Sequence, residues 1–368
     1  TTIFDYPVQH KGETIRGLVN SKKEVLEKEA CVDYAMHCCI TDLNEGEILE
    51  EMEKAVAEGI TSFKCFLVYK KEGMMLARLM LRAKELGAMI NIHAENPDLI
   101  DYYTEKFLSE GKTSAWEHYT SRPEFVEAEA DKRAVHWAKH LDAPLYLVHM
   151  ADKEGLEACI EAKEEGADVF VETCPQYLLL DDSVYAKPDF QGAVYVCAPP
   201  IRKKEDQDCL WEALSREDIQ TVATDQCSFT LAQKALGKDD FTKIPGGLPG
   251  VQTRGTLLYT YGVKEGRITQ EQMCKLLSEN PAKLYGVYPQ KGVLAPESDA
   301  DIVVLDPEKE SVISAATHAY NTDNNPFEGI RLRCGIDKVF LRGSLTVDDG
   351  RLVKEKLGKY IARGKKQM

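Results

Sequence analysis

The chain alternates short apolar runs with segments of helical periodicity. Seven runs have the length and composition of buried strands, and they begin near Thr1, Cys31, Ile60, Ala88, Pro144, Asp168 and Ile219. Between several of them, apolar residues recur at helical spacing and a glycine follows, as in the segment from Leu49 to Gly59. Strands that alternate with amphipathic helices predict a parallel sheet covered by helices on its outer face.

The number of strands indicates a closed barrel with one strand missing. A (β/α)8 TIM barrel needs eight strands, whereas the chain offers seven. An open doubly wound sheet is the alternative, but the Gly-rich phosphate turn typical of that fold does not follow any early strand. We therefore expect an α/β protein with a (β/α)8 TIM barrel over residues 1–291, its first strand absent from this chain.

The pattern changes after Gly292. Short apolar stretches separated by turn residues replace the alternation of strands and helices. This pattern is typical of small antiparallel β structures. We expect residues 292–368 to form the C-terminal part of a small β-sandwich appendage, followed by a tail.

Composition and charge disfavour several classes of function. With 46 Lys and Arg against 61 Asp and Glu, the net charge is −15, which repels nucleic acid and anionic membranes. No apolar run approaches the ~20 residues of a membrane-spanning helix. The 11 cysteines are irregularly spaced without a CxxC pair, as expected for reduced thiols in the cytoplasm. A cytoplasmic protein that acts on a small molecule is the expectation.

Lys64 interrupts the apolar run ITSFKCFLVY, and three other strand ends carry His93, His149 and Asp225. A buried ammonium group costs several kcal/mol unless it is paired or chemically altered. The carboxyl ends of barrel strands open on one face, where imidazole and carboxylate groups suit zinc and related divalent ions. A lysine joins such a site only as a carbamate, which is an oxygen ligand. The alternative is an ammonium group paired with Asp225.

The remaining histidines are weaker candidates. His37 stands beside two cysteines at a strand end, but adjacent thiols are poorly spaced for tetrahedral ligation, so core packing is favoured. His136 and His140 lie one helical turn apart on an outer helix, and we expect a solvated face there. For His10 and His118 we expect surface or loop positions.

Several longer motifs carry a resemblance to a known family. They are SFKCFLVY, HAEN, YLVHM, ETCPQYLLLDDSVY, TDQCSF and GGLPGVQTR, and together they resemble the dihydropyrimidinase/hydantoinase branch of the cyclic amidohydrolases. The resemblance implies two divalent metal ions, expected to be zinc, and a carbamate on Lys64 that bridges them. It also implies that His93 and His149 bind the second metal, that Asp225 binds the first metal and shuttles a proton, and that Tyr69 polarises the substrate carbonyl.

The implied activity is hydrolysis of the cyclic amide bond of dihydropyrimidines or 5-substituted hydantoins. A metal-bridging hydroxide attacks the ring, and the product is an N-carbamoyl amino acid. The resemblance further implies a homotetramer. Two alternatives stay open: a dihydroorotase or allantoinase, and a non-catalytic dihydropyrimidinase-like protein that acts by assembly.

The chain departs from the family pattern at several positions. The family supplies further metal ligands from an HxH pair at the end of its first barrel strand, and none of the eight histidines here forms such a pair. We therefore expect the HxH ligands in a part of the protein that precedes Thr1. The segment from Tyr69 to Leu76 is shorter than in the family. The expected substrate contacts Ala198 and Gly246 replace a serine and an asparagine, which leaves substrate choice open.

Overall fold

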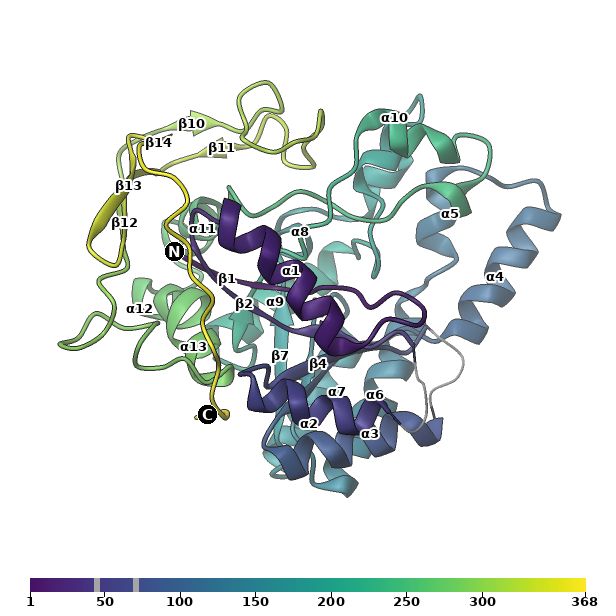
Figure 1. Cartoon of the computed structure of the whole chain (residues 1–368). Coiled ribbons are helices and arrows are strands. Elements are labelled where there is room, and N and C mark those ends of the chain that lie inside the picture. Colours follow the sequence, from purple (N-terminus) through teal and green to yellow (C-terminus); the bar gives the residue numbers. More distant parts are fainter. Residues whose placement is uncertain (43–46, 69–72) are drawn as a thin grey trace.

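The computed structural model describes residues 1–42, 47–68 and 73–368, and parallel strands run through its centre (Figure 1). One parallel sheet follows the order of the sequence, with β3 (Cys38–Cys39), β4 (Ser62–Phe66), β5 (Met89–His93), β6 (Leu145–Leu147), β7 (Val169–Thr173) and β8 (Thr221–Val222). β1 (Thr2–Asp5) pairs in parallel with β2 (Asp33–Met36), and only His37 separates β2 from β3. The predicted parallel sheet is confirmed.

Helices connect successive strands. Those between strands are α1 (Ile15–Glu29), α2 (Ile48–Ala57), α3 (Gly73–Leu86), α4 (Pro97–Ser109), α5 (Ala115–Thr120), α6 (Glu124–Leu141), α7 (Lys153–Glu164), α8 (Pro175–Leu179) and α9 (Lys204–Ser215). The face of α3 that the periodicity predicts, from Leu76 to Ala83, is buried. In Figure 1, α2, α3, α6 and α7 lie together on one side of the strands, and α3 and α7 each pack against α6. The predicted helical cover of the sheet is confirmed.

The other face of the sheet has its own apolar cluster. Met89 of β5, Tyr146 of β6 and Phe170 of β7 pack with Tyr285, and Phe4 of β1 packs against the same cluster. The ring centroids of Tyr146 and Phe4 lie 5.5 and 5.2 Å from that of Tyr285. β1 belongs to the two-stranded sheet with β2, so this cluster joins residues from both parallel sheets.

Short helices follow β8, and a second sheet then begins. The helices are α10 (Leu231–Lys234), α11 (Arg254–Leu258), α12 (Gln270–Cys274) and α13 (Asn280–Leu284). The antiparallel sheet has the order β14-β13-β12-β9, formed by β9 (Ile302–Asp306), β12 (Gly335–Leu341), β13 (Ser344–Asp348) and β14 (Arg351–Leu352). β10 (Ser311–Val312) and β11 (Arg331–Leu332) form a separate antiparallel pair. The predicted change to short strands after Gly292 is confirmed, whereas the domain boundary between 291 and 292 stays a prediction.

The last residues of the chain return to the parallel strands. In Figure 1 this yellow segment runs from the antiparallel sheet past β1 and β2. The amide of Tyr34 donates to the carbonyl of Lys359 at 2.9 Å, and the amide of Ile361 donates back to Tyr34 at 2.8 Å. The guanidinium group of Arg363 is buried and donates to Oγ of Ser62 at 2.8 Å. The predicted tail therefore extends the sheet at the edge of β2.

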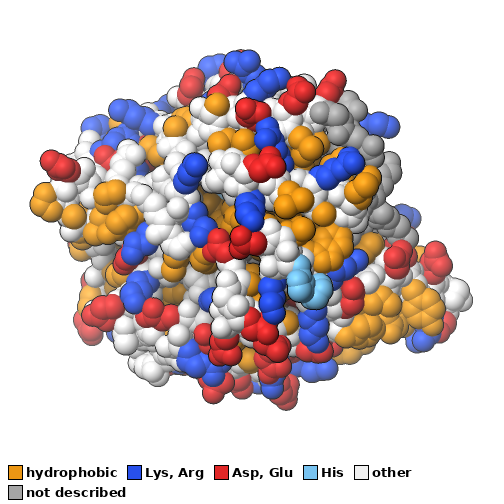
Figure 2. Space-filling view, turned by 90° about the horizontal axis from the view of Figure 1, so that it is seen from below, with side chains coloured by type: hydrophobic (Ala, Val, Ile, Leu, Met, Phe, Trp, Pro, Cys, Tyr) orange, Lys and Arg blue, Asp and Glu red, His pale blue; other side chains and the backbone are white. Residues whose placement is uncertain are grey.

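The surface carries both signs of charge. On the face shown in Figure 2, acidic and basic side chains are interspersed. Ion pairs such as Lys275 with Glu217, 2.8 Å apart, join neighbouring elements. Within the described part of the chain, no helix has the length and apolar character that crossing a membrane requires.

Candidate metal centre

The structure brings Lys64, His93 and His149 to one end of the parallel sheet. Lys64 lies in the middle of β4, His93 is the last residue of β5, and His149 follows β6 by two residues. All three side chains are buried. Nδ1 of His93 lies 2.9 Å from Nε2 of His149, and the two rings meet edge to face. Two imidazole nitrogens thus converge on one point beside a buried lysine.

The surroundings of His149 favour its neutral imidazole. Burial, followed by the neighbouring His93 and the charge of Lys64, lowers the pKa of His149 well below its usual range. A neutral imidazole has the lone pair that a metal ion requires, because only unprotonated histidine ligates. Among the described residues, Nδ1 of His149 has no hydrogen-bond partner. The donor set therefore fits a divalent metal ion.

The Lys64 ammonium has aromatic neighbours. It lies 4.9 Å from the ring centroid of Tyr6 and 5.1 Å from that of Phe66. In the described part of the chain, no carboxylate of Asp225 or of another residue forms an ion pair with it. Two faces of aromatic rings compensate a buried charge less well than a carboxylate does. The buried ammonium group thus lies against aromatic rings and forms no ion pair within the described part of the chain.

Asp225 belongs to the same end of the sheet but is not buried. It follows β8 by three residues, is exposed, and has a left-handed backbone with φ of 48°. The charges of Lys64 and Asp225 both act on the pKa of Cys39 and on that of Glu172, so the two groups face one region. The structure therefore gathers the four predicted ligands around the carboxyl ends of the strands.

Two buried carboxylates that the sequence analysis did not single out contact the histidines. Oε2 of Glu95 lies 2.8 Å from Nε2 of His93, and Oε1 of Glu172 accepts the backbone N–H of His149 at 3.2 Å. Burial raises the pKa of Glu172 to about 7, although the hydroxyl of Tyr146 donates to this carboxylate. Glu95 lies in the HAEN motif, two residues after the candidate ligand His93, and this proximity was an available signal. Glu172 lies in the ETCPQY motif, where no candidate ligand is near in the sequence.

The predicted substrate contacts are only partly described. Tyr69 lies outside the described residues. Ala198 is half-buried and Gly246 is exposed. A Cβ atom built on Gly246 would lie 3.8 Å from Cα of Cys197, the residue before Ala198, so the two segments lie side by side.

The other histidines divide between core and surface. His37 is buried and its Nδ1 contacts Oγ of Ser62, whereas His136 and His140 are exposed on α6. The expected surface or loop position is wrong for His118. It lies in α5, is buried, and its Nε2 is 2.8 Å from the carbonyl oxygen of Cys197. Burial lowers the pKa of His118 to about 3, so the ring is neutral and donates to this carbonyl.

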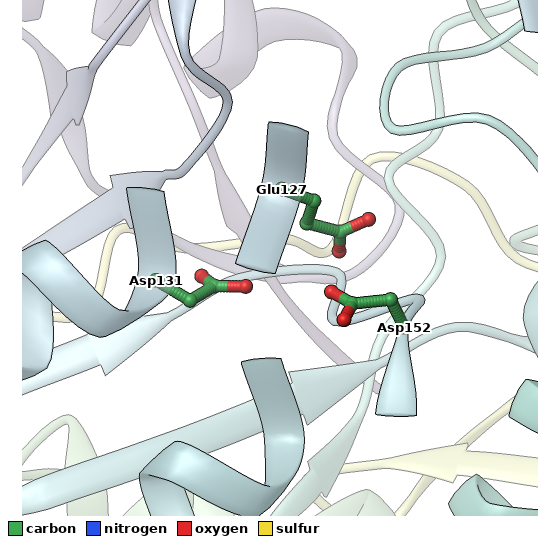
Figure 3. Close-up of side chains that lie close together, drawn as sticks. All are labelled: Glu127, Asp131 and Asp152. Carbon is green, nitrogen blue, oxygen red and sulfur yellow. The ribbon is translucent and has the colours of Figure 1, made fainter. Parts of the chain in front are cut away.

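A second group of possible metal ligands was missed by the sequence analysis. Glu127 and Asp131 of α6 and Asp152 before α7 are buried, and their carboxylates point toward one another (Figure 3). One oxygen from each lies within 4.8 Å of the others, an arrangement that suits a hard cation. Both oxygens of Glu127 already have partners, since Oε2 pairs with Arg202 at 2.7 Å and Oε1 accepts the amide of Ala151 at 2.9 Å.

This acidic cluster also suits bound protons. Among the described residues, Oδ2 of Asp131 and Oδ2 of Asp152 have no hydrogen-bond partner. Burial raises the pKa of Asp152 to about 6, and burial together with Glu127 raises that of Asp131 well above its usual range. A protonated carboxyl group donates a hydrogen bond to a neighbouring carboxylate, which removes one buried charge.

Comparisons with known proteins agree on one family. The family model described as "Amidohydrolase family" matches residues 39–346. The D-hydantoinase of Geobacillus stearothermophilus is 42% identical over 372 residues, which cover 99% of this chain and 79% of that protein. The dihydropyrimidinase from Brevibacillus agri NCHU1002 has a structure with a TM-score of 0.96 at 41% identity, covering 100% of this chain and 81% of that one. The L-hydantoinase from Arthrobacter aurescens gives 0.88 at 28% identity, covering 99% and 81%.

Proposed function

Because this chain belongs to the amidohydrolase family, in its branch of hydantoinases and dihydropyrimidinases, we propose that it hydrolyses cyclic amides. The substrates are dihydropyrimidines or 5-substituted hydantoins, and the products are N-carbamoyl amino acids. The observation that carries the proposal is the convergence of Nδ1 of His93 and Nε2 of His149 beside the buried Lys64. The family uses divalent metal ions, and these residues supply suitable donors.

Lys64, His93, His149 and Asp225 are the proposed metal ligands, and zinc is the proposed metal. Lys64 would contribute as a carbamate, whose two oxygens can hold two ions. This assignment is supported by the burial of Lys64, which forms no ion pair with the described residues. Bound metal ions would supply a hydroxide at neutral pH.

Side chains would carry out the proton transfer and stabilise the developing oxyanion. Asp225 would accept the proton of the attacking water and return it to the ring nitrogen as the C–N bond breaks. Tyr69, outside the described residues, would donate a hydrogen bond to the developing oxyanion. Ala198 and Gly246 would contact the substrate through their backbone groups. The exposed position of Asp225 supports a role at the substrate-facing side of the centre.

The finer architectural proposals follow from the same family. We propose that the parallel strands belong to a (β/α)8 TIM barrel, which the cluster shared by β1 and β7 supports. The appendage would be part of a small β-sandwich, beginning at residue 292. A homotetramer in the cytoplasm, with neither nucleic acid nor membrane as a partner, completes the proposal.

A substrate panel with metal analysis tests the function. Dihydrouracil and a 5-substituted hydantoin should be opened, whereas preferential turnover of dihydroorotate or allantoin would favour those enzymes. Two metal ions per chain are expected. A purified protein with neither metal nor turnover would favour the assembly alternative and contradict the proposal.

The variant Lys64→Ala tests the bridging carbamate. Activity should fall on the order of 10³-fold or more, because bound metal contributes several kcal/mol to transition-state stabilisation. Small carboxylates added to the buffer should restore part of it. The matched control is Lys84→Ala on the surface of α3, which should retain full activity. A fully active Lys64→Ala variant would contradict the mechanism.

A further inference from the structure

We propose that Glu95 is a positioning residue that fixes the tautomer of His93, so that Nδ1 of this histidine is its metal-binding atom. The inference rests on the proposed function only in taking His93 as a metal ligand. It concerns a residue that is not one of the four proposed ligands but contacts one of them.

The backbone places Glu95 on the same side as His93. Side chains two residues apart in an extended segment point to one face, and Glu95 follows His93 by two positions at the end of β5. The Glu95 side chain is fully buried, and its Oε2 lies 2.8 Å from Nε2 of His93. The opposite ring nitrogen, Nδ1, is the one that faces His149.

The charge of Glu95 decides which nitrogen of His93 carries the proton. The Glu95 carboxylate forms an ion pair with Arg122, and a carboxylate paired with a guanidinium group stays ionised. An ionised carboxylate only accepts hydrogen bonds, so Nε2 of His93 must carry the hydrogen. In a neutral imidazole the lone pair then belongs to Nδ1. A carboxylate behind a histidine in this way also makes the ring a stronger ligand.

Arg122 keeps the Glu95 carboxylate ionised. Its Nη1 donates to the same Oε2 atom at 2.6 Å, and its side chain is only 21% exposed. The backbone carbonyl of Arg122 accepts a hydrogen bond from Arg202, which pairs with Glu127 of the acidic cluster. Because Arg122 compensates the charge of Glu95, this carboxylate does not need to take the proton of His93.

A purely structural role for Glu95 would consist of compensating Arg122. Glu127 offers a matched control, because it is also a buried carboxylate paired with an arginine, yet it does not touch His93. Glu95→Gln and Glu127→Gln therefore make the same change from carboxyl to carboxamide at the two ends of one network. Only the first changes the group that receives the Nε2 proton, since a carboxamide both donates and accepts.

The test measures metal binding of the whole chain and not turnover. Zinc affinity is determined by competition with a chelator, and the visible absorption of the cobalt(II)-substituted protein reports on ligand geometry. Glu95→Gln should lower zinc affinity by about 10–100-fold and alter the cobalt spectrum. Arg122→Gln should lower it less, and Glu127→Gln should change neither readout.

Two outcomes would overturn the inference. One is a folded Glu95→Gln variant with the zinc affinity and cobalt spectrum of the parent, and the other is an equal loss in Glu127→Gln. If Glu95→Gln does not fold, an Arg122→Gln variant with unchanged zinc affinity would also overturn the inference. Failure of the proposed function differs from these, because it appears in the parent protein as absence of cyclic amide hydrolysis.

Discussion

Gly155 packs so closely against Asp131 that no side chain fits at position 155: a Cβ atom on Gly155 would lie 2.3 Å from Oδ2 of Asp131. Gly155 is in the first turn of α7, where alanine is otherwise favoured by about 1 kcal/mol. We expect Gly155→Ala to lower the free energy of unfolding by about 1–3 kcal/mol despite this gain, because the clash is with a buried carboxylate. Urea denaturation followed by circular dichroism measures the change.

A second substitution and a second glycine provide the controls. Asp131→Ala removes the nearer of two obstructing oxygens and leaves Oδ2 of Asp152 at 2.9 Å, so Gly155→Ala should cost less in that background. Among the described residues, no neighbouring atom lies within 4 Å of a Cβ atom placed on Gly255 of α11, so Gly255→Ala should be neutral or stabilising by up to about 1 kcal/mol. An equal cost of Gly155→Ala with and without Asp131 would contradict the packing argument.

The acidic cluster should make stability depend on pH. The folded pKa values of Asp152, about 6, and of Asp131 exceed the value near 4 that is usual for unfolded chains. The folded state therefore binds more protons than the unfolded state between these values. Its free energy of unfolding should fall as the pH rises from about 4 through about 6. Thermal unfolding of the metal-free protein across this range measures the effect.

The variant Asp131→Asn isolates the contribution of the cluster. It removes one titrating group, so the Tm of the variant should vary less with pH than that of the parent and should be higher at about pH 8. Asp142→Asn, at the exposed end of the same helix, is the control. Parallel profiles for the parent and Asp131→Asn would show that the cluster does not hold excess protons.

The parallel strands were predictable because their signal is local. Each apolar run is followed within a few residues by a turn or a glycine, and this pattern requires no knowledge of distant partners. The isolated β-bridge between Tyr34 and Tyr360 in the C-terminal segment was not predictable in this way. Residues around Ile361 have no long apolar run, and their partner Tyr34 lies more than 300 positions away in the sequence.

The same distinction applies to the functional residues. Lys64 and His93 stand out because a polar group interrupts or ends an apolar strand. Glu127 and Asp131 are one helical turn apart on an amphipathic helix, a pattern that ordinarily indicates a solvated face. Their burial depends on Arg202, which is 75 residues away from Glu127. His118 was misassigned for a similar reason, since its acceptor at Cys197 is remote in sequence.

Glu172 should affect catalysis through His149. His149 has a left-handed backbone with φ of 46°, which is uncommon for a residue with a side chain, and its amide donates to Glu172. We expect Glu172→Ala to lower kcat/KM for a 5-substituted hydantoin by about 10–100-fold, because His149, a proposed metal ligand, loses the acceptor of its backbone N–H. Glu172→Gln keeps an oxygen acceptor and should retain more activity.

The control for Glu172 is a surface glutamate. Glu161→Ala, on the exposed side of α7, should leave kcat and KM unchanged. Zinc affinity measured in parallel should fall in Glu172→Ala and stay the same in Glu161→Ala. Unchanged kinetics in a folded Glu172→Ala variant would show that His149 keeps its place without this carboxylate.

Arg363 should be the most important residue of the C-terminal segment for stability. It donates to Oγ of Ser62, at the start of the strand that carries Lys64, and lies 5.7 Å from the ring centroid of Phe4. The shorter Arg363→Gln side chain cannot replace these contacts, so the free energy of unfolding should fall by about 1.5–3 kcal/mol. Lys354→Gln is the control in the same segment, where an exposed side chain should contribute less than about 0.5 kcal/mol. Equal stability of the two variants would mean that the segment is held by its backbone pairing with Tyr34 alone.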